Sequence, residues 1–488
     1  MNILIDSIRQ DTEYRELSKL IKKNFSDKPF PCVAGGLCDG ASDALIMSLL
    51  EDTLGERKLP ALVVCSEEKE CLRLQQLFEK FGFRAAFYIA RDLTFHNIVA
   101  SHEYEHERLR VLSGIISGAY DVVFTTPDTA LGFTIPREKL ESNIIDIDYD
   151  TVIPPSELAK RLVDAGYIRV DMVEGQGQFA VRGGIVDVYP PMSTFVDNNG
   201  AEYKESGAIR IEFFDDEIDR LGVFDIDTQR LIMGIKSLKI TPARELLIND
   251  KARERLVDII TKEIKNAPDA QTKQILNSEL AAVKAQNTEI KFADKYISSI
   301  YPEKQTLLDY FTEKTLFVIR SSAKVKERLK SSKWHEEEMI KSLCSDGLVN
   351  PKFAEYSKPA AALDLFSSTN VTLHVDSLAY GATDKRLSGL FGFRTRQPVT
   401  YVDNFNLLCE DILGYLKGKY KVIIMAENEQ SAHNLREMLE EADFNAVCED
   451  AKKQVSISDI PQNVIYIKWR EYMYPFGASR RGLLASDR

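Results

Sequence analysis

Short apolar runs alternate with amphipathic helical stretches along the first third of the chain. The runs at 61–66, 85–90 and 120–126 are almost continuous in apolar residues, as strands buried on both faces of a parallel sheet are. Stretches with helical periodicity at 67–81 and 102–117 separate these runs. This alternation predicts an α/β fold with a wound sheet.

The pattern changes near residue 135 to shorter, alternating segments. Four glycines and two prolines between residues 175 and 191 punctuate them, which is typical of antiparallel hairpins. We therefore expect a small α/β domain inserted into the first one. A charged helical pattern returns over 250–298, and the segment 315–321 predicts another buried strand.

A last α/β unit is predicted from about residue 370. Its expected strands are the segments NVTLHVDSL, PVTYVD, KVIIMA and NVIYIK, which surround a helix predicted over 428–442. The expected domains are therefore 1–134 (domain 1a), 135–210 (the inserted domain 2), 211–368 (domain 1b, the remainder of the first lobe), 369–476 (domain 3) and 477–488 (a frayed tail).

Composition narrows the class of protein. The chain has 488 residues, 44% of them hydrophobic and 28% charged, with a net charge of −12. No apolar run approaches the ~20 residues that a membrane span needs, and the N-terminus lacks the basic and apolar regions of a secretory signal. Seven cysteines without a CxxC pair favour free thiols in a reducing cytoplasm, with no disulfide or zinc framework. The acidic charge disfavours nucleic acid as the main partner and favours proteins.

The segment GGLCDGAS has the spacing of a phosphate-binding loop. Gly35, Gly40 and Ser42 fit G-x-x-x-x-G-K-[ST], in which backbone N–H groups hold phosphate and the hydroxyl holds Mg²⁺. Ala41 stands where the motif has the lysine that reaches the β and γ phosphates. We therefore expect a degenerate, nucleotide-free loop between a strand and a helix; weak residual nucleotide binding is the alternative.

Two further motifs favour structural interpretations. His102 to His106 spell H-E-x-x-H, which can bind zinc on a helix, but the sequence offers neither a third ligand nor apolar walls, so we expect a solvated helix face. The segment EGQGQ lacks the third glycine of a dinucleotide motif and predicts a turn. No catalytic residue, metal ligand or cofactor site is predicted.

The hairpin region carries a resemblance to a known family. The segments GQFAVRGGIVD (177–187) and FFDDEID (213–219) resemble the bacterial transcription-repair coupling factors (Mfd) and, more distantly, the excision-repair protein UvrB. The resemblance covers most of residues 25–325. It implies a degenerate P-loop (RecA-like) helicase lobe with a small inserted α/β domain, followed by a second small α/β domain.

The resemblance also implies that a second part of the nucleotide site is missing. In UvrB the strand after the segment resembling LLDYF ends in an acidic pair that places Mg²⁺, whereas here TLFVI is followed by Arg320 and Ser321. The lysine and the carboxylates are thus missing together. ATP is expected as a cofactor only in the motor of a longer parent, which the family implies to be an ATP-dependent DNA translocase.

The family further implies that the inserted domain recruits the damage-recognition protein UvrA, while domains absent from this chain bind RNA polymerase and DNA. Arg169, Arg182 and Phe179 are the expected docking residues, because arginines and an aromatic anchor suit such contacts. Asp187 is expected to orient the arginines or to pair with the partner. The alternatives are that Arg182 pairs internally with Asp187 or another carboxylate and that Phe179 is a core residue.

The sequence thus favours a UvrA-recruiting adaptor in nucleotide excision repair, located in the cytoplasm and without enzymatic activity of its own. A standalone P-loop ATPase or helicase with an atypical loop is the chief rival hypothesis. Direct nucleic-acid binding is a third, and the net charge of −12 disfavours it.

Overall fold

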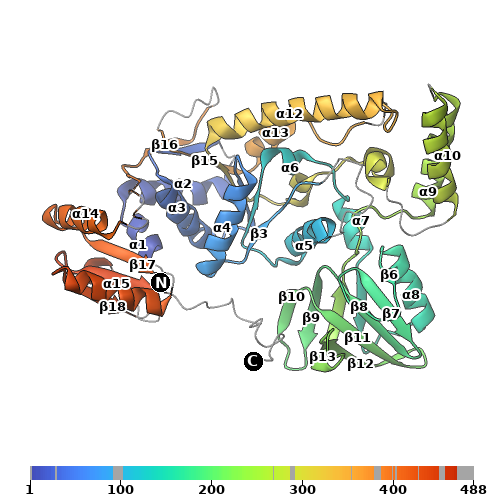
Figure 1. Cartoon of the computed structure of the whole chain (residues 1–488), viewed down its shortest axis with the longest axis horizontal. Helices are drawn as coiled ribbons and strands as arrows, with labels where there is room; N and C mark the ends of the chain where they lie inside the picture. Colours follow the sequence, from blue (N-terminus) through green and yellow to red (C-terminus); the bar gives the residue numbers. More distant parts are fainter. Residues whose placement is uncertain are drawn as a thin grey trace. The chain divides into compact units, whose positions relative to one another are not determined.

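The chain is a mixed α/β structure, as its apolar pattern predicts (Figure 1). The computed structural model describes residues 3–469 except 28–29, 92–102, 268, 286–291, 353, 379–385, 398, 400, 402–403, 427 and 450–456. The expected frayed tail at 477–488 lies outside the described residues. Within the described ranges, no helix is long and apolar enough to cross a membrane.

The chain divides into two compact units, which we describe separately. Unit 1 comprises Met1–Glu56, Gln76–Phe83 and Leu373–Phe476. Unit 2 comprises Arg57–Gln75, Arg84–Thr372 and Gly477–Arg488.

Unit 1 contains a parallel sheet that carries the GGLCDGAS loop. Its strand β1 (Cys32–Gly35) pairs with β15 (Val371–Asp376) on one edge and with β16 (Gly389–Gly392) on the other. All four residues of β1 are buried, as its apolar sequence predicts. The helices of this part of the unit are α1 (Ile3–Arg9), α2 (Thr12–Ser26) and α3 (Asp39–Asp52).

The region 369–476, expected as one small domain, contributes to two sheets. β15 and β16 pair in parallel with β1, so they extend the sheet of the loop. A separate parallel sheet has the order β17-β19-β18. Its elements are β17 (Val422–Ala426), β18 (Ala446–Glu449), β19 (Ile465–Trp469), α14 (Phe405–Lys417) and α15 (Glu429–Glu441), and a 3-10 turn lies at Ile457–Asp459. The expected strand PVTYVD falls mostly outside the described residues.

Unit 2 contains four parallel strands in the order β14-β2-β4-β3. Their bounds are β2 (Ala61–Val64), β3 (Ala85–Phe87), β4 (Val122–Thr125) and β14 (Leu316–Arg320). β2, β4 and β14 are buried throughout, which explains why their sequences are apolar up to the last residues of β4 and β14, Thr125 and Arg320. Helices α5 (Glu103–Ser117) and α6 (Pro127–Leu131) follow in the same unit, and α4 (Glu68–Lys80) begins in it.

The inserted domain of unit 2 is a largely antiparallel sheet with one packed helix, drawn in teal and green (Figure 1). Its strand order is β10-β9-β13-β12-β11-β8-β7-β6, and β5 pairs with β13. The elements are β5 (Ile145–Asp148), α8 (Pro155–Asp164), β6 (Ile168–Arg169), β7 (Gln178–Arg182), β8 (Ile185–Tyr189), β9 (Ser193–Asp197), β10 (Glu202–Glu205), β11 (Ala208–Phe214), β12 (Glu217–Phe224) and β13 (Leu231–Ile240).

This sheet extends beyond the expected limits of 135–210. A boundary at 210 would fall inside β11, which pairs with β8 on one side and with β12 on the other. β13 then closes the domain by pairing with β12, β9 and β5. Because this ladder is continuous, residues 145–240 form one structural domain.

The remaining helices of unit 2 lie on both sides of the inserted domain in the sequence, and the charged helical pattern over 250–298 predicts α9 and α10 among them. Their bounds are α7 (Arg137–Ser142, before the insert), α9 (Asp250–Lys265), α10 (Ala270–Lys284), α11 (Ile297–Ile300), α12 (Ser322–Ser345) and α13 (Ala361–Thr369), with 3-10 turns at Ala293–Tyr296 and Leu307–Tyr310. Asn249 caps α9 by accepting the Ala252 N–H at 3.0 Å, and Asp269 caps α10 by accepting the Thr272 N–H at 2.7 Å.

Candidate functional site

The GGLCDGAS loop joins β1 to α3 and is closed by another segment of unit 1. The Phe393 N–H donates to the Gly35 carbonyl at 2.8 Å, and the Thr395 N–H donates to the Gly36 carbonyl at 3.3 Å. The Cys38 N–H, which precedes the helix, donates to Thr395 Oγ1 at 2.7 Å. The threonine hydroxyl therefore takes the acceptor position that a phosphate oxygen would need at this N–H.

The glycine that this turn requires is Gly36. It has a φ of +79°, and a Cβ built on it would lie 2.1 Å from the Phe393 carbonyl oxygen. Gly40 lies in the first turn of α3, and a Cβ there would meet nothing within 4 Å. Ala41 and Ser42 follow in the helix, with Ser42 buried. The strand, loop and helix occur where the motif predicts them, but Gly40 is not needed for their shape.

The last residue of β14, Arg320, forms a structural ion pair with α4. Arg320 is 3% exposed, and its Nε lies 2.6 Å from Glu70 Oε1 of α4. Ser321 takes a left-handed conformation, with φ of 58°, at the start of α12. A paired guanidinium cannot coordinate Mg²⁺, so the end of β14 offers no carboxylate for a metal-assisted phosphate reaction.

The cavity of about 830 Å³ in unit 2, lined partly by α12 and α6, is also a poor site for phosphate groups. Each lysine and arginine on its described walls forms an ion pair with a carboxylate, which reduces the positive charge that these walls offer to an anion. These pairs are Arg91–Glu245, Arg108–Glu245, Arg328–Asp128, Lys333–Glu336 and Lys358–Asp309.

In the inserted domain, Phe179 is a core residue. Its side chain is fully buried and belongs to the cluster that Leu158 and Leu162 of α8 form with the inner faces of the strands. It therefore cannot serve as an exposed aromatic anchor, and the alternative that the sequence left open for it is correct. The register explains this position, since Phe179 lies opposite Val188, another buried core residue.

Arg182 and Asp187 pair with one another, and a second arginine joins them. Asp187 is fully buried, and its Oδ2 lies 2.5 Å from Arg182 Nη2. Arg210 of β11 binds the same carboxylate through Nε at 2.7 Å and Nη2 at 2.9 Å, and its guanidinium lies 4.7 Å from the centre of the Phe224 ring. The hydrogen bond to Asp187 is the largest cause that raises the pKa of Arg210. We call Arg182, Asp187 and Arg210 the arginine cluster.

The arginine cluster carries a net positive charge, because two guanidiniums share one carboxylate. Arg210 is 14% exposed, whereas Arg182 is 45% exposed. Gln229 contacts both arginines: its backbone carbonyl accepts from Arg210 Nη1 at 3.0 Å, and its side-chain Oε1 lies 3.5 Å from Arg182 Nη2. The structure therefore buries one arginine and presents the other.

Arg169 lies in β6, the two-residue strand at the edge of the sheet, and both residues of β6 are exposed. It is opposite Phe179 in the parallel pairing with β7. Arg169 and Arg182 are thus exposed residues of adjacent strands. The alternation of β7 puts Arg182 with Asp187 and Arg210 on the face opposite the core that Phe179 enters. Sequence reasoning missed Arg210; the signal was the alternation Ile209, Arg210, Ile211, which puts the arginine on the face opposite the core.

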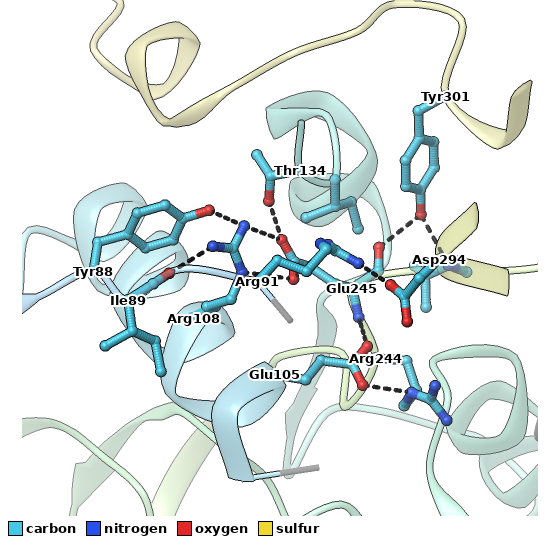
Figure 2. A network of polar contacts seen from close by, with 12 residues as sticks. Tyr88, Ile89, Arg91, Glu105, Arg108, Thr134, Arg244, Glu245, Asp294 and Tyr301 are labelled. Atoms are coloured by element: carbon cyan, nitrogen blue, oxygen red, sulfur yellow. Dashed lines mark hydrogen bonds and ion pairs between the residues drawn. The ribbon is translucent and has the colours of Figure 1, made fainter. Parts of the chain in front are cut away.

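A buried polar network connects the inserted domain to the rest of unit 2 (Figure 2). At its centre is Glu245, 1% exposed, in the segment that leaves β13. Arg108 of α5 binds this carboxylate through Nε and Nη2, at 3.0 Å each, and Arg91 Nη2 lies 2.7 Å from Oε2. The Thr134 hydroxyl donates to Oε1, and Arg91 also pairs with Asp294. Burial opposes ionisation of Glu245, but Arg108 and Arg91 outweigh it and hold the pKa of this carboxyl below its ordinary value of 4.5.

The first turns of α5 contact the inserted domain directly. Glu105 accepts the Glu245 N–H at 2.6 Å and lies 2.8 Å from Arg244 Nε. His106 is 7% exposed, and a Cβ on Gly177 would lie 2.8 Å from its Nε2. The solvated face expected for H-E-x-x-H is therefore wrong at His106, because the turn at Gly177 packs against this ring. His102 lies outside the described residues.

Within the part of the chain that the structure describes, no group of three or more His, Cys, Asp or Glu side chains could hold a metal ion.

Comparison with known proteins identifies the inserted domain first. Residues 145–246 match the family model described as the UvrB interaction domain, and this range coincides with the sheet from β5 to β13 and the segment that leaves it. The inserted domain is thus similar to the UvrB interaction domain.

The chain as a whole is similar to curated proteins named transcription-repair-coupling factor. It is 28% identical over 375 residues to that of Bacillus subtilis (strain 168), covering 73% of this chain and 30% of that protein. It is 19% identical over 460 residues to that of Staphylococcus aureus (strain MRSA252), covering 90% of this chain and 36% of that protein. These matches confirm the resemblance to the UvrB-like region of transcription-repair-coupling factors. The chain spans about a third of the length of these relatives.

Proposed function

We propose that this chain is an adaptor whose inserted domain docks UvrA in nucleotide excision repair. The UvrB interaction domain and the relationship to transcription-repair-coupling factors support this class of role. The observation that carries the proposal is the arginine cluster, in which Arg182 is oriented by a buried carboxylate and remains 45% exposed. A pre-oriented guanidinium with excess positive charge around it suits a carboxylate on a partner surface.

The docking surface that we propose consists of Arg182 and Arg169 with two exposed apolar neighbours of Arg169. Ile168 is 38% exposed and Met172 is 43% exposed, so both can be covered by a partner. Arginines beside apolar side chains are the typical composition of the residues that dominate binding energy at interfaces. Asp187 and Arg210 hold Arg182 in place within this surface.

The adaptor has no nucleotide cycle of its own in this proposal. Three features support this: Thr395 accepts the Cys38 N–H, Ala41 has no ammonium group, and Arg320 is paired with Glu70. In the longer relatives, ATP-driven translocation and the binding of RNA polymerase and DNA would then belong to other regions. Such an adaptor needs no cofactor and works in the cytoplasm.

The test is the affinity of the purified chain for UvrA, measured by biolayer interferometry at two salt concentrations. Arg182→Ala and Arg169→Ala should each weaken binding about 10-fold, since each removes an exposed charged anchor. Arg161→Ala is the matched control, because Arg161 is exposed on α8 of the same domain and lies 3.6 Å from Glu157. Wild-type affinity in both docking variants, or an equal loss in the control, would remove the proposed surface.

A further inference from the structure

A cluster of exposed apolar side chains lies at the tip of the β11–β12 hairpin, apart from the arginine cluster. Phe214 is 73% exposed, Val152 is 70% exposed and Tyr149 is 45% exposed. Two segments far apart in the sequence place Phe214 and Val152 on either side of Glu217, which is the register partner of both, and the Ile153 N–H donates to the Asp216 carbonyl at 2.8 Å. The Tyr149 hydroxyl accepts the Leu221 N–H at 3.3 Å. We call Phe214, Val152 and Tyr149 the hairpin-tip patch.

These three side chains do not belong to the hydrophobic core of the inserted domain. Along the same two segments, Ile153 and Ile218 are buried in the core of the inserted domain, and Phe213 packs against that core. Phe214 is the next residue on β11 and therefore points away from it. The turn itself is made by Asp215, with φ of 54°, and Asp216. Single exposed apolar residues are ordinary, but three on adjoining segments with a charged rim mark an interaction site.

The rim of the hairpin-tip patch is strongly acidic. Residues 148–153 and 214–220 contain six carboxylates and one guanidinium, a formal charge of −6 + 1 = −5. All six acids are exposed, namely Asp148, Asp150, Asp215, Asp216, Glu217 and Asp219. Such a rim repels nucleic acid and anionic lipid surfaces, and it attracts lysine and arginine side chains.

We propose that the hairpin-tip patch binds a basic, amphipathic protein segment, whose apolar side chains cover Phe214 and Val152 and whose lysines or arginines face the acidic rim. The hairpin-tip patch is acidic and would bind a basic partner, whereas the arginine cluster is basic and would bind an acidic one. Phe214 is the anchor, because it is the most exposed aromatic side chain of the patch and immediately precedes the two-residue turn between β11 and β12. This surface goes beyond the docking of UvrA and is tested without UvrA, so each proposal stands or fails separately.

The test uses the full chain and a fluorescent 18-residue peptide in which leucines and lysines alternate at helical spacing; a peptide with glutamates in place of the lysines is the second probe. Fluorescence anisotropy should show saturable binding of the basic peptide that weakens with salt, and no binding of the acidic one. Phe214→Ala should weaken binding about 10-fold. Asp215→Asn with Asp216→Asn should weaken it about 5-fold and reduce the dependence on salt. Both changes are on the surface, so the fold is retained.

Two control variants make the same changes elsewhere. Leu365→Ala removes an apolar side chain that is 66% exposed on α13, and Glu254→Gln with Asp258→Asn removes two exposed acids of α9. Both should bind the basic peptide as the wild type does. The proposal is overturned if the basic peptide does not bind, if the acidic peptide binds equally well, or if the control variants lose as much affinity as those of the hairpin-tip patch.

Discussion

Replacing Asp187 by asparagine tests whether its carboxylate stabilises the fold mainly through the buried Arg210 and only weakly through the exposed Arg182. Asp187 is fully buried and receives two hydrogen bonds from Arg210, at 2.7 and 2.9 Å, while Arg210 is 14% exposed. Removing the carboxylate leaves that guanidinium buried without a counter-charge, which costs about 3–5 kcal/mol. The pair with Arg182 contributes less than about 1 kcal/mol, because Arg182 is 45% exposed and water screens it.

The assay is hydrogen exchange of the β8 and β11 amides, because the chain has several domains and its global unfolding is not a single transition. Asp187→Asn should lower protection by about two orders of magnitude, the equivalent of about 3 kcal/mol. Double-mutant cycles with Arg210→Met and Arg182→Met should give a coupling above about 2 kcal/mol for the first pair and below about 1 kcal/mol for the second. Equal couplings, or unchanged protection in Asp187→Asn, would refute this division of roles.

Three further outcomes follow from the same structure. Gly36→Ala should destabilise unit 1 by about 2 kcal/mol or more in thermal unfolding, because Gly36 has a positive φ and lies against the Phe393 carbonyl. Gly40→Ala should leave the stability within about 1 kcal/mol of the wild type, because a Cβ there meets nothing. Folding lowers the pKa of Glu245 below its ordinary value of 4.5. The stability that its ion pairs contribute is therefore present above pH 4.5 and is lost as the pH falls through the lower folded pKa. Glu245→Gln should remove this loss of stability from an acid titration followed by circular dichroism. A fluorescent ATP analogue with Mg²⁺ should bind more weakly than about 1 mM, and saturable tighter binding would favour the ATPase hypothesis.

The strands of this fold could be predicted because burial imposes a simple pattern on them. β2, β4 and β14 are buried on both faces, so their sequences are apolar except at the last residues of β4 and β14, Thr125 and Arg320. The limits of the domains could not be found in this way. β11, β12 and β13 belong to the inserted domain through pairings with strands far away in the sequence, and no local pattern specifies such partners.

In the candidate site too, contacts between residues near in sequence could be predicted, and contacts between distant strands could not. Arg182 and Asp187 lie five residues apart on one hairpin, so the sequence allowed their pairing to be considered. Arg210 lies 23 residues after Asp187, in β11, the strand that neighbours β8 in the sheet. Its role therefore depends on the register of β8 with β11. Phe179 was misassigned as an anchor because aromatic residues suit both cores and interfaces, and only burial separates the two.

The loop and the H-E-x-x-H segment illustrate what a motif leaves undetermined. The spacing of Gly35, Gly40 and Ser42 predicted a strand, a turn and a helix, which the structure contains. It did not indicate Thr395, which lies 357 residues after Cys38 and binds its N–H. In the same way, the burial of His106 depends on a turn at Gly177 in another domain.

The most direct measurement is the affinity for UvrA of the wild-type chain compared with a chain that carries both Arg169→Ala and Arg182→Ala. The account predicts saturable binding by the wild type that weakens about 100-fold in the double variant, with circular dichroism showing that the fold is kept. No binding of the wild type, or equal affinity of the two chains, would contradict the claim that this surface makes the chain a UvrA adaptor.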